Sequence, residues 1–353
     1  MYDSYKAEYH RYIHRKVIFC LLCILLILAS LGVGVWAGKY DIGFFESYKV
    51  LIDHIMGNGA MNGRSDIVIW DVHLPRAVAG LIAGAGLGVC GAVMQSSMKN
   101  PLADPYTTGI SSGASLGATL AIIAGVSVLP GLGSMAGIAV NAFVFALIPA
   151  MVIILISTFK TNMTSTSIIL IGVAVMYVFS ATDTLLKVST TVEKLADAYI
   201  WGIGTLGRAT WENIPMMAVV TAIGIAFFML VSSKVNIMSL NDKSIVSLGE
   251  NPKRIRIGFM AIVAMMTSIV VAITGTIGFV GLVAPHIVRL VIGSDSRYLI
   301  PASACFGAAF LMFADCLARV LTSTGLPVGV ITSLIGGPLF LFILIKTRAK
   351  SAW

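Results

Sequence analysis

The stretch "LPRAVAGLIAGAGLGVCGAVMQSSMKNPLADPYTTGISSGASLGA", residues 74–118, joins two apolar runs through a short polar interruption. The first run lies near 77–98 and the second near 109–128. Between them, Asn100-Pro101-Leu102-Ala103-Asp104-Pro105 contains two prolines, which fix φ and lack a backbone donor. A single helix cannot run through such a segment, so the stretch predicts two helices that meet at a stiff polar loop.

Glycines recur at every fourth position on both sides of this loop, at Gly80, Gly84 and Gly88 before it and at Gly109, Gly113 and Gly117 after it. Each series leaves one helix face without side chains, so that a neighbouring backbone can approach closely. One such strip indicates tight packing alone. Two strips on either side of one loop favour a closely packed hairpin made by the two helices.

The composition of the whole chain is that of a membrane protein. Its 353 residues are 58% hydrophobic and only 11% charged, with a mean hydropathy of +0.94, whereas soluble domains carry about 25% charged residues. The first apolar run, 17–37, follows a basic arm. It is longer than the apolar core of a cleaved signal peptide and no small-residue cleavage site follows it, so we expect a retained membrane helix.

Ten apolar runs predict an all-α integral membrane protein with about ten membrane helices. They lie near 17–37, 77–98, 109–128, 135–158, 167–186, 214–233, 258–274, 278–292, 301–321 and 328–345. Some are short, and Pro285 interrupts the eighth, so short or tilted helices are expected. With both termini in the cytoplasm, 16 lysines and arginines fall inside and 8 outside, which favours this N-in/C-in topology. Topology and anionic lipid account for the net charge of +8, and no nucleic acid is required.

The motifs of common enzymes are absent from the sequence. There is no GxxxxGK[ST] phosphate loop and no HExxH zinc motif, so any ATP would be hydrolysed by a partner. All five cysteines lie in apolar runs, including the Cys20 and Cys23 pair, which indicates buried small side chains and neither a metal nor a disulfide. These observations therefore point away from a phosphate-loop ATPase, a zinc enzyme and a cysteine metal site.

One enzymatic alternative remains open. GISSG and GASLG, with Ser111 and Ser115 at the serine position and Ser112 beside Ser111, match the GxSxG pattern, which has meaning only between a strand and a helix. An intramembrane serine protease would use one of these serines with His286 as its base. The commoner role of such serines is as small residues of a membrane helix.

The residues of the opening stretch resemble the second and third helices of the FecCD family, the permeases of ABC importers for iron(III) chelates and cobalamin. "GTIGFVGLVAPHIVRLVIGSDSRYLIPASACFGAAFLMFADCLARV" (275–320) and "LPVGVITSLIGGPLFLFILIK" (326–346) resemble its C-terminal half. NPLADP and GFVGLVAPHIVR are specific to the family, and the likeness covers nearly the whole chain.

The resemblance implies a type II ABC importer permease in the cell membrane, a transporter subunit that is not itself an enzyme and has no catalytic residue, cofactor or metal site. It would be a homodimer, or a pseudo-homodimer with a second permease, bound to two ABC ATPase subunits that hold ATP and Mg²⁺. A periplasmic or lipid-anchored binding protein would deliver an iron(III) chelate, a siderophore or haem, with cobalamin as the alternative cargo. An ion-driven secondary transporter is a further alternative. The expected division is a basic cytoplasmic arm at 1–16, a permease domain at 17–346 and a cytoplasmic tail at 347–353.

The resemblance also assigns residues to the pathway. Asn100 and Leu102 correspond to a cytoplasmic gate, and Thr166 and Ser167 to a second constriction beside it. Caps of neighbouring helices are the alternative role for Asn100 and Ser165. The pathway lining would include Gln95, Ser111 and Ser112.

The longest basic loop, 234–257, resembles the coupling segment that contacts the ATPase through two short helices. Ile245, Val246 and Leu248 form an apolar cluster there, followed by Gly249 in the Leu-Gly position of the family. The family often has Gly-Glu where this chain has Asn241-Asp242, and a small alanine at Ile245. An ordinary positive-inside loop would explain the basic residues but not the apolar cluster.

Three residues near the expected outer face resemble docking positions for the binding protein: Arg76, Arg319 and, in place of a third arginine, His73. Asp315 lies four residues before Arg319 and therefore on the same helix face. An internal Asp315–Arg319 ion pair is the alternative.

Overall fold

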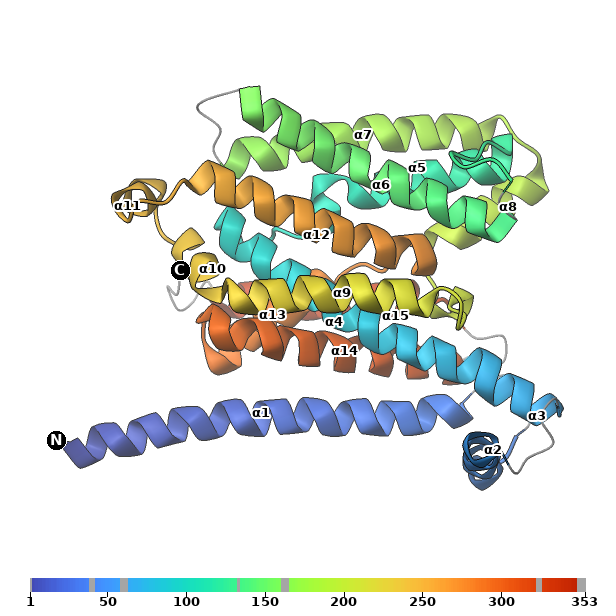
Figure 1. Ribbon diagram of the computed structural model, residues 1–353, viewed down its shortest axis with the longest axis horizontal. Helices are drawn as coiled ribbons and strands as arrows, with labels where there is room; N and C mark the ends of the chain where they lie inside the picture. Colours follow the sequence, from blue (N-terminus) through green and yellow to red (C-terminus); the bar gives the residue numbers. More distant parts are fainter. Residues whose placement is uncertain are drawn as a thin grey trace.

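The computed structural model describes residues 2–37, 42–57, 63–131, 134–159, 165–321 and 326–347, and this part of the chain contains helices and no strand (Figure 1). The long helices are α1 (Tyr2–Trp36), α4 (Leu74–Met98), α6 (Ser134–Phe159), α7 (Ser165–Val188), α9 (Ile214–Leu230), α12 (Pro252–Thr274), α14 (Ser296–Val320) and α15 (Val328–Thr347). The shorter helices are α2 (Phe44–Met56), α3 (Arg64–Ile67), α5 (Ile110–Thr119), α8 (Val192–Gly202), α10 (Ser232–Met238), α11 (Asp242–Ser247) and α13 (Val280–Ile292). Four further turns are η1 (Val68–His73), η2 (Pro105–Thr108), η3 (Leu120–Ala124) and η4 (Leu206–Arg208).

The expected apolar runs all appear as helices in the described residues. Six helical segments are long and apolar enough to span a membrane. The pair α9 and α10 forms a further span that bends by 69°, and three shorter apolar helices correspond to the runs at 109–128, 278–292 and 328–345. Pro285 lies inside the 13-residue α13. The prediction of an all-α, multi-pass fold with some short spans is confirmed.

Helix α4 lies in the middle of the bundle and is buried along most of its length. It packs against α9, α12, α13 and α14, while α5, α6 and α7 form a layer on the far side of α12 (Figure 1). Helix α1 packs along α14 at the opposite edge, and its outer apolar side chains are exposed, as expected for a helix that faces lipid.

The two glycine strips do not pack against each other, so the predicted hairpin contact is wrong. A Cβ atom on Gly84 or Gly88 would collide with the backbone of α14, at Gly307 and Ser303 respectively. The strip of α5 instead faces the backbone of α6, where Gly113 meets Phe145. The polar loop and η2 carry α5 away from α4, so each strip serves a different neighbour.

The two ends of the bundle differ in character. Residues 2–16 of the predicted basic arm form the first turns of α1, which begins at Tyr2. The Lys16 ammonium lies 3.3 Å from the ring centroid of Tyr298 at the start of α14. Helices α10 and α11, within the predicted coupling loop, lie at the same end, which we assign to the cytoplasm because of its basic residues. Of the predicted tail 347–353, residues 348–353 lie outside the described residues.

The opposite, outer end carries α2 and α8, which the apolar pattern did not predict (Figure 1). His54 of α2 lies 2.6 Å from Asp66 and stacks on Trp70, which ties α2 to the start of the second span.

Candidate translocation pathway, gate and coupling segment

An open cavity of about 680 Å³ lies between α5, the segment that leads into α13, and α15. Its lining consists of Asp104, Tyr106, Thr107, Ser111, Gly202, Ile203, Thr276, Gly278, Phe279, Leu282, Gly329, Val330, Ser333 and Leu334. Hydroxyl and apolar groups dominate this surface, and Asp104 is the one charged side chain among these residues. Such a lining suits the passage of a bulky solute better than its tight retention.

Phe279 shapes the cavity wall at an unusual backbone position. Its φ of 68° lies in the left-handed region, which costs a residue with a bulky side chain about 1–3 kcal/mol. The conformation places its ring against Gly336 and Gly337 of α15, where a Cβ on Gly336 would collide with it. The paired glycines therefore let α13 and α15 approach each other beside the cavity.

The predicted pathway residues have different positions. Ser111 lines the cavity. Ser112 is buried and donates its hydroxyl to the Gly109 carbonyl at 2.9 Å. Gln95 is also buried, and its Nε2 donates to the Leu282 carbonyl at 3.1 Å, which ties α4 to α13. Of the three, only Ser111 is therefore in contact with the cavity in this conformation.

The polar loop after α4 is held rigidly by its own side chains. The Oδ1 atom of Asn100 accepts from the Leu102 amide at 2.9 Å, which closes a turn and does not cap a helix. Asp104 caps η2, because its Oδ1 accepts from the Tyr106 amide at 2.7 Å. Burial raises the pKa of Asp104 to about 6, although the Tyr106 amide opposes the shift.

The four predicted gate residues, Asn100, Leu102, Thr166 and Ser167, lie on two separate elements. The Leu102 side chain projects outward and is 45% exposed. Thr166 is exposed and Ser167 is partly buried, both in the first turn of α7. Leu102 and Thr166 thus have surface available for contacts with a second subunit, while Asn100 shapes the loop from within.

The apolar cluster of the coupling segment divides into a buried and an exposed part. Ile245 is fully buried, in a core cluster that includes Met98, Val235 and Met238. Val246 and Leu248 are exposed on the same short helix or directly after it. Ile245 therefore supports the segment from within, and its predicted contact with an ATPase is not available in this conformation. Gly249 ends α11 with a φ of 80°, a region that favours glycine.

Asp242 begins α11 and accepts from two cations on other elements. Its Oδ1 lies 2.5 Å from the Lys99 ammonium and 3.1 Å from Nη2 of Arg256. Partial burial opposes ionisation, but hydrogen bonds and charge from Lys99 and Arg256 hold the pKa of Asp242 below its ordinary value.

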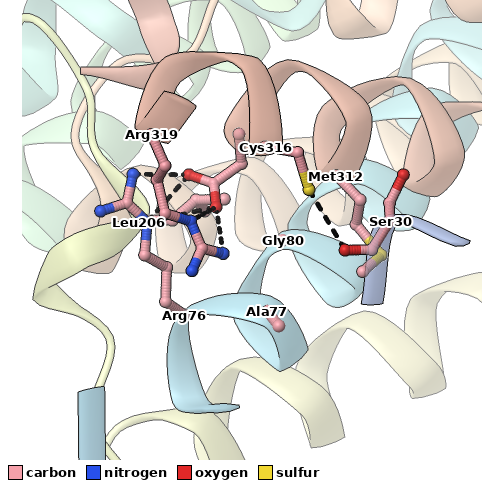
Figure 2. Close-up of a pocket in the computed structure, with 9 residues that line it drawn as sticks. Ser30, Arg76, Ala77, Gly80, Leu206, Met312, Cys316 and Arg319 are labelled. Atoms are coloured by element: carbon pink, nitrogen blue, oxygen red, sulfur yellow. Dashed lines mark hydrogen bonds and ion pairs between the residues drawn. The ribbon is translucent and has the colours of Figure 1, made fainter. Parts of the chain in front are cut away.

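Two of the three predicted docking residues, Arg76 and Arg319, meet at a buried ion cluster (Figure 2). Asp315 accepts from Nε and Nη2 of Arg76 at 2.9 and 2.7 Å, and from Nε of Arg319 at 2.8 Å. The Asp315 carboxylate is 2% exposed, and the side chains of Arg319 and Arg76 are 5% and 17% exposed. The internal Asp315–Arg319 pair is therefore present, and Arg76 bridges to it from α4.

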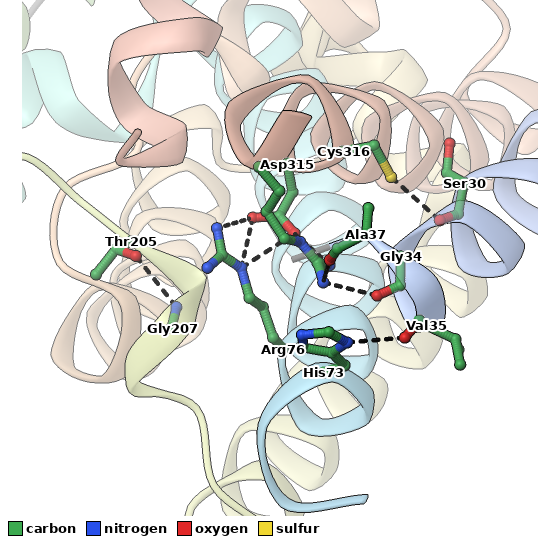
Figure 3. A network of polar contacts seen from close by, with 11 residues as sticks. Ser30, Gly34, Val35, Ala37, His73, Arg76, Thr205, Gly207, Asp315 and Cys316 are labelled. Atoms are coloured by element: carbon green, nitrogen blue, oxygen red, sulfur yellow. Dashed lines mark hydrogen bonds and ion pairs between the residues drawn. The ribbon is translucent and has the colours of Figure 1, made fainter. Parts of the chain in front are cut away.

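Arg319 and His73, the third predicted docking residue, also hold the end of α1 (Figure 3). Nη1 of Arg319 donates to the carbonyls of Gly34 and Ala37, and Nδ1 of His73 lies 2.7 Å from the Val35 carbonyl. Helix C-termini leave such carbonyls unpaired and attract cations. Arg319 and His73 are thus anchors for α1, and Arg76 has more surface available to a partner.

The serines of the protease alternative have other contacts. Ser115 donates its hydroxyl to Asp183 at 3.1 Å, and Ser112 donates to the Gly109 carbonyl. Ser111 lines the cavity. The His286 ring packs edge-on against Phe340. A serine nucleophile requires a base within hydrogen-bonding reach.

An all-helical, multi-pass protein with a solute-sized cavity beside a rigid polar loop has the features of a membrane permease. The chain belongs to the FecCD transport family, whose sequence pattern matches residues 22–346. It is 32% identical to the Fe(3+)-citrate import system permease protein YfmD of Bacillus subtilis, over 94% of this chain and 96% of that one. It is 37% identical to the cobalamin import system permease protein BtuC of Halobacterium salinarum, over 79% of this chain and 74% of that one.

A solved structure supports the same assignment. The fold matches an inward-facing conformation of a provisionally named metal-chelate type ABC transporter with a TM-score of 0.79, at 28% identity, over 93% of this chain and 98% of that one. The family predicted from the opening stretch is confirmed, and so is a multi-pass position in the cell membrane.

Proposed function

We propose that this chain is the membrane-spanning subunit of an ATP-driven importer for an iron(III) chelate, a siderophore or haem. The observation that carries the proposal is the cavity of about 680 Å³ beside the rigid polar loop, in a chain of the FecCD transport family. Pockets for drug-sized ligands measure about 300–1,000 Å³. A second subunit that contributes the same surface would enlarge the path further.

The assembly that we propose contains two copies of the permease, or one copy with a related permease, and two ATPases at the cytoplasmic end. Val246 and Leu248 provide an exposed apolar surface for an ATPase there. A binding protein docks at the outer end, where Arg76 has the more accessible guanidinium of the two arginines. Asn100 and Leu102 with Thr166 and Ser167 form the cytoplasmic gate.

Transport by the purified complex tests the proposal. The permease, its ATPase and its binding protein are reconstituted in liposomes. Uptake is measured in turn with ⁵⁵Fe-labelled iron(III) citrate, iron(III) hydroxamate and haem, and with cobalt-labelled cobalamin. We expect uptake of one of the iron(III) chelates that requires both ATP and the binding protein. Uptake of cobalamin alone would replace the substrate and keep the transport mechanism. Uptake that persists without the ATPase would favour an ion-driven transporter and overturn the proposal.

A further inference from the structure

Arg256 is a buried cation at the cytoplasmic end of α12. It is 2% exposed, and its Nε donates to the Ser97 carbonyl in the last turn of α4 at 3.1 Å. Its Nη2 donates to Asp242, the first residue of α11. One guanidinium therefore connects the coupling segment to α4, although Ser97 and Asp242 are more than 140 residues apart in the sequence.

The last turn of α4 is held by a second arginine. Nη2 of Arg289, on α13, donates to the Ser96 hydroxyl at 2.8 Å and to the Ala92 carbonyl at 3.3 Å. Cations are favourable at this end of a helix, because its last carbonyls lack partners within the helix. The end of α4 is therefore fixed by side chains from α12 and α13.

Lys99 joins the same cluster from the other side of the turn. It ends α4 in the left-handed region, with φ 51° and ψ 37°, and its ammonium contacts Asp242 at 2.5 Å. The next residue is Asn100, which begins the rigid gate loop. A bulky residue in this backbone region is found where surrounding contacts hold it, often at functional sites.

Lys99 and Arg256 differ in how tightly they bind Asp242, and so in how tightly they join α11 to the end of α4. Asp242 itself is partly exposed, so its pair with Lys99 alone would be weak in water. Arg256 is buried, and a buried charge left without its partner is strongly unfavourable. Displacement of α11 must therefore move the end of α4 with it or separate Arg256 from its carboxylate.

We propose that Asp242 is a positioning residue that links the coupling helix α11 to the gate, through Arg256 to the last turn of α4 and through Lys99 to the gate loop. The inference rests on the proposed function, because it assigns the path by which an ATPase at Val246 and Leu248 moves the gate. The apolar contact attaches the ATPase, and the ion cluster carries the movement onward.

Two substitutions break the cluster to different extents. Asp242→Asn removes the carboxylate from both cations. Lys99→Met removes only the link to the gate loop and keeps the Asp242–Arg256 pair, and the Lys99 side chain is partly exposed. Glu250→Gln is the matched control, because it removes a partly exposed ion pair of the same segment, Lys234–Glu250 at 3.1 Å, whose two residues both lie in the coupling segment.

The readout is the gate itself. Spin labels at Leu102→Cys in both subunits of the reconstituted complex report the distance across the gate, without nucleotide and with ATP and vanadate. We expect Glu250→Gln to respond like the parent complex. Lys99→Met, and the Asp242→Asn complexes that assemble, should keep ATP hydrolysis, while chelate transported per ATP falls roughly tenfold, which corresponds to the loss of a pairwise interaction of about 1.4 kcal/mol. The nucleotide-dependent change in distance should shrink accordingly.

The outcomes separate this inference from the proposed function. If the parent complex neither binds an ATPase nor transports an iron(III) chelate, the proposed function fails. If the parent complex transports and Lys99→Met keeps the full distance change and the full transport per ATP, only the link through Lys99 is wrong. If assembled Asp242→Asn complexes also respond like the parent complex, the whole inference is overturned.

Discussion

At the scale of single residues, the structure changes the role of the arginines near the outer face. Helical spacing correctly indicated that Asp315 and Arg319 share a face, but it could not show that Arg76 reaches the same carboxylate. Two guanidiniums share Asp315, and the carbonyls of Gly34 and Ala37 accept from Nη1 of Arg319. A buried charge is tolerated where its partners are this complete.

The two arginines should respond differently to substitution. Arg319→Gln leaves the Asp315 carboxylate with one cation and frees the end of α1, so we expect it to lower the stability of the purified permease by about 3–5 kcal/mol. Arg76→Gln should cost less stability but slow association with the binding protein, most visibly at low salt. Thermal unfolding in detergent and association kinetics measure the two effects. A fully stable Arg319→Gln protein with slow association would restore Arg319 as a docking residue.

Asp104 offers a test by pH. Its folded pKa of about 6 is above its ordinary 3.8, so the folded state holds the proton more tightly and stability falls as pH rises from about 4 to 6. The cost of the buried anion above pH 6 is about 3 kcal/mol. Asp104→Asn keeps a good N-cap and carries no charge. Its melting temperature should exceed that of the parent protein at pH 7.5 and match it near pH 4; a difference that is independent of pH would contradict the assignment.

At the scale of helices, the glycine strips show what a local pattern can and cannot specify. The spacing of Gly84 and Gly88 correctly predicted a close helix contact. The identity of the partner was missed, because α14 follows more than 200 residues later and offers its own Gly307 to the contact. A periodic pattern defines a face, and only the whole fold decides what covers it.

Substitution of Gly88 tests this contact. Gly88→Ala would place a Cβ against the Ser303 backbone, which cannot move without shifting α14. We expect a clear loss of folded protein and of melting temperature. Gly258→Ala in α12 is the control, since nothing lies within 4 Å of its Cβ position, and alanine should favour that helix by up to about 1 kcal/mol. Equal behaviour of the two variants would contradict the packing described here.

The coupling segment allows a second comparison. Leu248→Asp changes an exposed side chain, so the permease should fold normally yet fail to bind the ATPase, because the charge would be buried unpaired at that interface. Ile245→Asp places the same charge in the permease core and should prevent folding. Size-exclusion chromatography and co-purification with the ATPase distinguish the two defects. Normal ATPase binding by Leu248→Asp would remove Leu248 from the interface.

At the scale of the whole molecule, the features that depend only on residues close together in the sequence were predicted correctly. Apolar length and basic loops predicted the spans, and prolines predicted the break after α4. The contact of Arg76 with Asp315 and the contacts of Lys99 and Arg256 with Asp242 were missed, because each joins elements that are distant in sequence. Arg256 illustrates the difficulty: in sequence it is one of several basic loop residues, and only the fold shows that it is buried. The two clusters lie near opposite ends of α4, with about 30 Å of helix between Arg76 and Ser97.

The last prediction concerns how two copies close the path. Leu102 projects from the rigid loop and Thr166 from the first turn of α7, and both are exposed in the single chain. If these side chains meet across the axis of a dimer, Leu102→Cys should form a cross-linked dimer on oxidation in at least one nucleotide state, and the cross-link should stop transport. Leu170→Cys is the comparison variant, because Leu170 is an exposed apolar residue of α7 about one turn further into the span than Thr166. If the contact of Leu102 is specific, the two variants should cross-link with different dependences on nucleotide. Random collision would give both variants the same dependence. Cross-linking should also be reversible with reductant and restore uptake. Labelling of Leu102→Cys by a lipid-soluble reagent in every state, with no dimer formed, would show that this loop faces lipid and does not form the gate.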